Sequence, residues 1–197
     1  MKFEKQMNFE KQLQTLLDLS PSHVQRHFAC DCAERALMQA GVTDKRSWES
    51  VRLSRLFAEG GATLQDLLAV RVLARLAARD AWCVWEERRD WRKGDAFWAT
   101  WSAREAAQQH DTRAAWEAAH ASRESAWDYE RLNTVSREPS HKTRELIWKS
   151  QIAHLQSMID ALNHARSSLL SVISIRAVIL KSILPRNAQA FEEILFE

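Results

Sequence analysis

Helix-breaking residues are scarce in this chain, and their scarcity constrains the fold more than any other feature of the sequence. Only four glycines and three prolines occur in 197 residues. Folds rich in β-structure need many tight turns built from these residues, whereas helices joined by short loops need few. Hydrophobic residues make up 46% of the chain, which is enough for one domain with a buried core. We therefore expect an all-α protein: a single bundle of about six to seven helices.

Residues that favour the starts and ends of helices predict where the helices lie. Ser20 can cap a helix that begins with Pro21 and ends at Gly41. A second helix is expected from about Asp44 to Phe57. A third is expected from Thr63 to the break at 92–95. Further helices are expected after Asp95, over 112–132, and after the loop at 136–140.

The two ends of the chain differ from its middle. We expect an amphipathic N-terminal arm over 1–18, a helical domain over 19–165 and an apolar C-terminal extension over 166–197 that docks or oligomerises. A β-hairpin is an alternative for part of this extension, and Pro185 should end its apolar stretch. Arg176 and Lys181 argue against a membrane span. The seam of Leu155, Ile159 and Leu162 makes a homodimer possible.

The stretch "HVQRHFACDCAERAL" at 23–37 suggests metal or redox chemistry at first sight. On a helix, His23, His27, Cys30 and Glu34 fall within about 60° of one another, whereas Cys32 points to the opposite side. The two cysteines therefore cannot form a redox dithiol. A zinc site at His23, His27 and Cys30 stays an alternative, but one helix seldom supplies all the ligands. The favoured interpretation is a polar helix face, with no metal and no cofactor.

Catalysis and nucleic-acid binding find little support in the sequence. No nucleophile elbow frames a serine, and no glycine-rich loop could hold a phosphate. We expect Cys83 to be buried between two tryptophans rather than catalytic. The net charge is only +2 and both signs are spread along the chain, which makes nucleic acid an unlikely partner. The odd number of cysteines, three, and the charged N-terminus predict a cytoplasmic protein. The absence of these catalytic motifs predicts that it is not an enzyme.

Tryptophan is the outlier of the composition, with nine residues. Most of these rings should fill the core against small alanines on facing helices. The remaining rings could anchor a protein partner, because tryptophan and arginine dominate interface hot spots. The candidate partner-binding residues are Trp91, Trp98, Trp101, Arg88, Arg89, Arg92, Phe191 and Phe196.

Three segments in order carry a family resemblance: "RHFACDCAERAL" at 26–37, "RLFAEGGAT" at 55–63, and the helices rich in Ala, Arg and Trp from "ARDAW" onward. Over about residues 20–160 the chain resembles the Imm-five-like immunity proteins, a helical family of bacteria and phages. The resemblance implies a compact α-helical domain that neutralises a toxin or effector by binding it. The arm at 1–18 and the tail at 166–197 fall outside the pattern.

The polar residues of the first two segments suggest a structural role. Asp31, Glu34, Arg35 and Arg55 could form a cluster that fixes how the first two helices cross. The sequence thus predicts an inhibitor or immunity-type protein that binds a toxin or effector. An alternative is a phage-encoded inhibitor of a host defence complex, such as an anti-CRISPR protein. A metal-binding helical protein is the further alternative.

Overall fold

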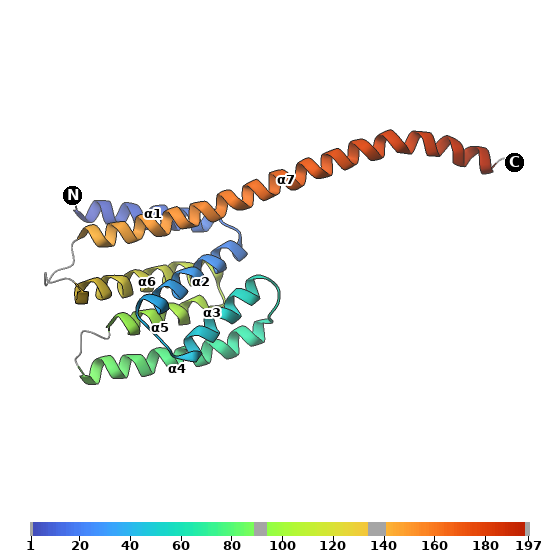
Figure 1. The fold of residues 1–197 in the computed structure, drawn as a ribbon. Coiled ribbons are helices and arrows are strands. Elements are labelled where there is room, and N and C mark those ends of the chain that lie inside the picture. Colours follow the sequence, from blue (N-terminus) through green and yellow to red (C-terminus); the bar gives the residue numbers. More distant parts are fainter. Residues whose placement is uncertain (1, 89–93, 134–140, 196–197) are drawn as a thin grey trace. The chain divides into compact units, whose positions relative to one another are not determined.

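The computed structural model describes residues 2–88, 94–133 and 141–195, and these residues form helices joined by short turns, with no strand among them (Figure 1). The all-α prediction is therefore confirmed. The helices are α1 (Lys2–Leu19), α2 (Ser22–Gln39), α3 (Lys45–Ala58), α4 (Leu64–Arg88), α5 (Gly94–Ala106), α6 (Asp111–Asn133) and α7 (His141–Leu195).

The chain divides into two compact units, Met1–Gln156 and Ser157–Glu197. The first unit includes α1, which the sequence suggested as a separate arm. Leu13 and Leu17 of α1 are fully buried, and Glu10 pairs with Arg123 of α6. The unit boundary lies at 156/157, nine residues before the expected start of the C-terminal extension at 166.

Two glycines end helices as their backbone conformation requires. Gly41 has φ 62° and follows α2, where Val42 N–H donates to Leu37 O at 3.0 Å. Gly60 has φ 75° and follows α3, where the next amide donates to Leu56 O at 2.8 Å. Only glycine adopts this left-handed conformation without strain, and the returning amides satisfy carbonyls that the helix leaves free.

The starts of the helices match the sequence in part. Asp44 caps α3 by accepting from Arg46 N at 2.9 Å, and Thr63 caps α4 through a reciprocal pair of hydrogen bonds with Asp66. The expected cap at Ser20 is wrong, because its hydroxyl donates back to Leu16 O and so closes α1 instead. Asp95 lies inside the first turn of α5 rather than before it.

Alanine fills the centre of the first unit, where α2, α5 and α6 pack against one another (Figure 1). Small side chains allow helix backbones to approach closely. Hydroxyl groups use this closeness: Ser50 Oγ donates to Ala103 O at 3.0 Å and Ser102 Oγ to Ala118 O at 2.8 Å, each from one helix to the main chain of the next. The buried alanines of these three helices are Ala29, Ala33, Ala36, Ala99, Ala103, Ala106, Ala114, Ala115, Ala118, Ala119 and Ala121.

The expectation that most tryptophans fill this core is wrong for the described rings. Trp148 alone among them is fully buried, with 1% of its surface exposed, and it stacks on Trp116 at 5.9 Å. The others are half-buried or, like Trp82, exposed. With alanine backbones so close together, the centre has little room for indole rings, which cover its edges instead.

The second unit contains one helix, the part of α7 that starts at Ser157. Pro185 was expected to end a helix but lies inside α7, which continues to Leu195. Leu169, Leu170 and Ile173 are 60–64% exposed. Among the described residues, no helical stretch combines the length and the apolar character that crossing a bilayer demands.

Candidate functional site

The residues considered for a metal site do not converge. His23 is exposed and His27 is half-buried, whereas Cys30 is fully buried. The thiol of Cys30 faces α3, where it donates to Val51 O at 3.6 Å, and burial raises its pKa to about 12. The expectation that Cys30 joins the histidines is thus corrected, because α3 covers its side of α2. The described part of the chain holds no group of three metal-ligating side chains.

A polar cluster does form between α2, α3 and α7. Arg55 donates to Asp31 at 2.9 Å and to Glu34 at 2.6 Å, and His154 Nε2 lies 2.8 Å from the other oxygen of Asp31. Arg35, the fourth expected member, is exposed and pairs with none of these carboxylates. His154 lies 123 residues from Asp31. No local sequence pattern predicts this contact, which links α7 to α2.

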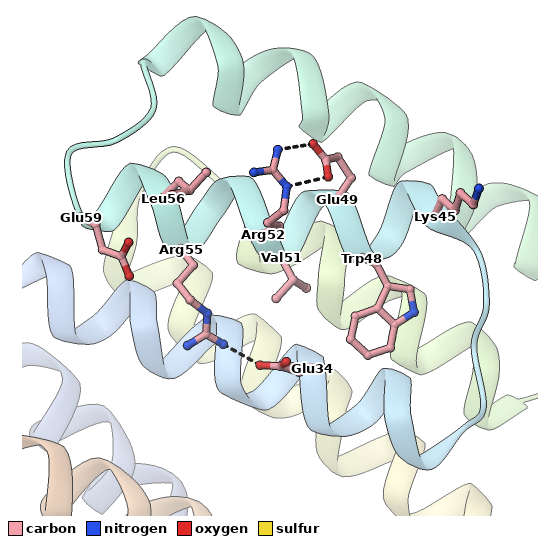
Figure 2. Close-up of a pocket in the computed structure, with 9 residues that line it drawn as sticks. All are labelled: Glu34, Lys45, Trp48, Glu49, Val51, Arg52, Arg55, Leu56 and Glu59. Atoms are coloured by element: carbon pink, nitrogen blue, oxygen red, sulfur yellow. Dashed lines mark hydrogen bonds and ion pairs between the residues drawn. The ribbon is translucent and has the colours of Figure 1, made fainter.

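A groove of about 630 Å³ adjoins this cluster along α3 (Figure 2). Its charges are largely neutralised from within. Arg52 Nε donates to Glu49 at 2.8 Å, and Arg55 points across the groove floor to Glu34 (Figure 2). Of the lining charges, only Lys45 and Glu59 form no ion pair within the described residues, and a bound molecule would have to displace an ion pair to reach any of the others. The lining residues are Glu34, Lys45, Trp48, Glu49, Val51, Arg52, Arg55, Leu56 and Glu59.

A second groove, of about 510 Å³, lies between α4 and α5 and has the opposite electrostatic character. Three arginines line it and no carboxylate does. Arg104 lies over the Trp101 ring, 4.1 Å from its centroid, and so presents its guanidinium beside an aromatic surface. The lining residues are Val72, Arg75, Leu76, Ala78, Arg79, Trp82, Trp101 and Arg104.

An aromatic cluster supports this second groove from below. Phe97 of α5 is 4% exposed and lies 5.0 Å from Trp82, 5.8 Å from Trp85, 5.0 Å from Trp98 and 5.6 Å from Trp101, measured between ring centroids. Rings at these separations attract one another beyond their simple burial. The cluster therefore holds Trp82 and Trp101, which line the groove, in defined positions.

The solvent side of α4 continues the groove as an apolar surface, which we call the α4 face. It comprises Leu64, Leu68, Val72, Leu73 and Leu76, of which Val72 is the most exposed at 59%. Four of these residues recur at every fourth position from Leu64 to Leu76, so they form a row along one side of the helix. The opposite side of α4, with Leu67, Val70, Ala74 and Ala77, is buried.

The predicted partner-binding residues fall into two sets. Trp101 lines the α4–α5 groove, and Trp98 is half-buried against Phe97. The side chains of the others lie outside the described residues, namely Trp91, Arg88, Arg89, Arg92, Phe191 and Phe196. Sequence reasoning missed the α4 face, although the four-residue spacing of its row of side chains was a visible signal.

Comparisons of the chain with models of protein families, with curated proteins and with solved structures found no match.

Proposed function

We propose that the protein is a non-enzymatic inhibitor or immunity-type protein that neutralises a toxin or effector by binding it directly. The α4 face is the observation that carries the proposal. A row of large apolar side chains on the surface beside an aromatic and arginine-lined groove is typical of a protein-binding site. The resemblance to Imm-five-like immunity proteins supports the same class.

The α4 face has binding free energy still to gain. Complete burial of a leucine or valine side chain contributes about 1.5–3 kcal/mol. Leu64, Leu68 and Leu76 are still 38–41% exposed, and Val72 more so. Covering this row with another protein would therefore release a substantial apolar contribution without any rearrangement of α4.

Two kinds of target fit this mode of action. A toxin or effector would make the protein an immunity factor, whereas a subunit of a host defence complex would make it a phage-encoded inhibitor such as an anti-CRISPR protein. Both act in the cytoplasm, which the odd number of cysteines supports. No contact in the described residues favours the metal-binding alternative.

Partner capture with a matched pair of variants tests the proposal. Val72→Glu places a charge in the middle of the α4 face, and Met38→Glu places the same charge on an exposed apolar residue of α2. We expect the wild type and Met38→Glu to recover one stoichiometric protein partner and Val72→Glu to lose it. A partner that Val72→Glu still retains, or recovery of the bait alone by the wild type, would contradict the proposal.

We also propose that the second unit mediates homodimerisation. Its helix exposes Leu169, Leu170 and Ile173, and the second unit has no other helix among its described residues to cover them. A second copy offers the same apolar residues in return, which is the simplest way to cover them. Sedimentation equilibrium should give a dimer for the wild type and a monomer for Leu170→Glu/Ile173→Glu; a monomeric wild type would refute this.

A further inference from the structure

We infer that the groove between α4 and α5 recognises an acidic amphipathic helix of the partner protein; this inference rests on the proposed function. It combines three features of one surface: two exposed arginines without an ion pair among the described residues, a row of apolar side chains along the same helix, and an aromatic wall that packs on Phe97.

Two of the three arginines that line the groove, Arg75 and Arg79, have no carboxylate partner within the described residues. By contrast, Arg46 pairs with Asp80 at 2.8 Å and Arg55 pairs with two carboxylates. Like charges four residues apart on a helix cost about 0.2–0.5 kcal/mol. Carboxylates supplied from outside would turn this repulsion into charge-assisted hydrogen bonds.

Arg104 extends the same positive surface onto α5. Its Nε lies 3.5 Å from the carboxylate of the buried Glu105, which partly neutralises its charge. Its guanidinium lies over the Trp101 ring. An arginine whose side chain already rests on a ring loses less conformational freedom when it binds a carboxylate, and its planar guanidinium suits two-point recognition.

The apolar row next to these arginines matches a helix as the occupant. Leu64 and Leu76 are twelve residues apart, which corresponds to about 18 Å along α4. An amphipathic helix of a little over three turns has the same length and presents apolar residues at three- and four-residue spacing. Glutamates or aspartates on the flank of its apolar stripe would lie opposite Arg75 and Arg79.

The surface suits a nucleic acid less well. A phosphate backbone binds best to a surface of one sign, and here one wall is leucine and valine. An acidic amphipathic helix would use both the arginines and the apolar row.

Titration with synthetic peptides tests the inference. The probe is an 18-residue helical peptide with leucines at core spacing and glutamates on both flanks, and its matched control carries lysines in place of the glutamates. We expect the acidic peptide to bind and to quench the fluorescence of the groove tryptophans, whereas the lysine peptide should not bind. Raising NaCl from 0.1 to 0.5 M should weaken binding to the unmodified protein several-fold.

A pair of charge reversals locates the binding. Arg75→Glu/Arg79→Glu should raise the Kd of the acidic peptide at least tenfold, whereas Arg113→Glu, an exposed arginine of α6, should leave it unchanged. Circular dichroism verifies that each variant is folded. An unchanged Kd for the double variant, equal binding of the lysine peptide, or no salt dependence would overturn the inference. Tighter binding to phosphatidylserine vesicles or to a DNA duplex would overturn it as well.

The two proposals fail separately. If a captured protein partner depends on Val72 but tolerates Arg75→Glu/Arg79→Glu, the protein is a binder whose partner is not acidic at this groove. If no partner depends on the α4 face, the proposed function fails whatever the peptides do.

Discussion

Replacement of Arg26 by methionine should destabilise the first unit more than any surface change. Arg26 lies on α2, is 1% exposed, and reaches the turn between α5 and α6. Its guanidinium donates to Ala106 O and Gln109 O at 3.1 Å each and pairs with Asp111. One side chain thereby satisfies the end of α5 and the start of α6 and ties both to α2.

The expected loss follows from these contacts. Breaking a fully buried ion pair by removing one partner costs about 3–5 kcal/mol, and this pair should cost less, because Asp111 is 24% exposed and keeps access to water. Ala106 O, which is buried, loses its donor in the same substitution, and a buried group left unsatisfied costs about 1–3 kcal/mol. Gln109 is exposed, so water can replace the donor to its carbonyl. Methionine restores part of the packing volume but no hydrogen bond. We therefore expect Arg26→Met to lower the free energy of unfolding by about 4 kcal/mol, a large share of a typical 5–15 kcal/mol.

Urea denaturation followed by circular dichroism at 222 nm measures this loss directly. Arg113→Met is the matched control, since Arg113 is exposed and its one ion pair is a 4.0 Å contact on the surface of α6; it should change stability by less than about 0.5 kcal/mol. A loss of under about 1 kcal/mol for Arg26→Met would show that the buried network does not hold α2 to the α5–α6 turn.

Three further predictions concern single sites. Burial, and next the cation of Arg123 at 2.8 Å, hold the pKa of His120 below its usual 6.5, so the folded state favours neutral imidazole. The corresponding stability is present above pH 6.5 and lost as the pH falls through the lowered pKa; His120→Gln should flatten this part of a stability–pH curve. Native protein at pH 8 should react with a thiol reagent only at Cys83, which is exposed, and unfolding in urea should release both other thiols; rapid reaction of all three would contradict the burial. Gly41→Ala should cost about 1–2 kcal/mol through its left-handed backbone alone, since no atom lies within 4 Å of the new Cβ, and more than Gly61→Ala in the same urea assay.

Several helix boundaries were predictable from the sequence, because the capping interactions that set them involve residues close together in the chain. Gly41 ends α2, and Asp44 and Thr63 begin the next two helices, each through hydrogen bonds within a few residues. Ser20 shows the limit of such signals. A serine can close one helix or open the next, and the choice was made here by its hydrogen bond to Leu16 O.

Contacts between distant helices were not predictable in this way. The helical periodicity of α2 correctly predicted that Cys32 lies in the core. It carries no information on the packing of α3, which buries Cys30 as well. Cys83, expected between two buried tryptophans, is exposed because the two rings turn toward Phe97 of α5. His154 joined the polar cluster through a contact 123 residues along the chain. Each of these outcomes depends on helix packing rather than on local spacing.

The contrast between the two grooves is the strongest argument for where a partner binds. Both grooves contain tryptophan and arginine, so composition does not distinguish them. Along α3 the arginines are already bound to Glu49, Glu34 and Asp31, and a ligand would have to compete with these intramolecular partners. Between α4 and α5 the exposed arginines have no such competitor among the described residues, and the adjoining apolar row is still open. Binding gains free energy from apolar side chains that are still exposed and from charges that are still unpaired after folding. Among the described residues, both kinds of group lie side by side on α4.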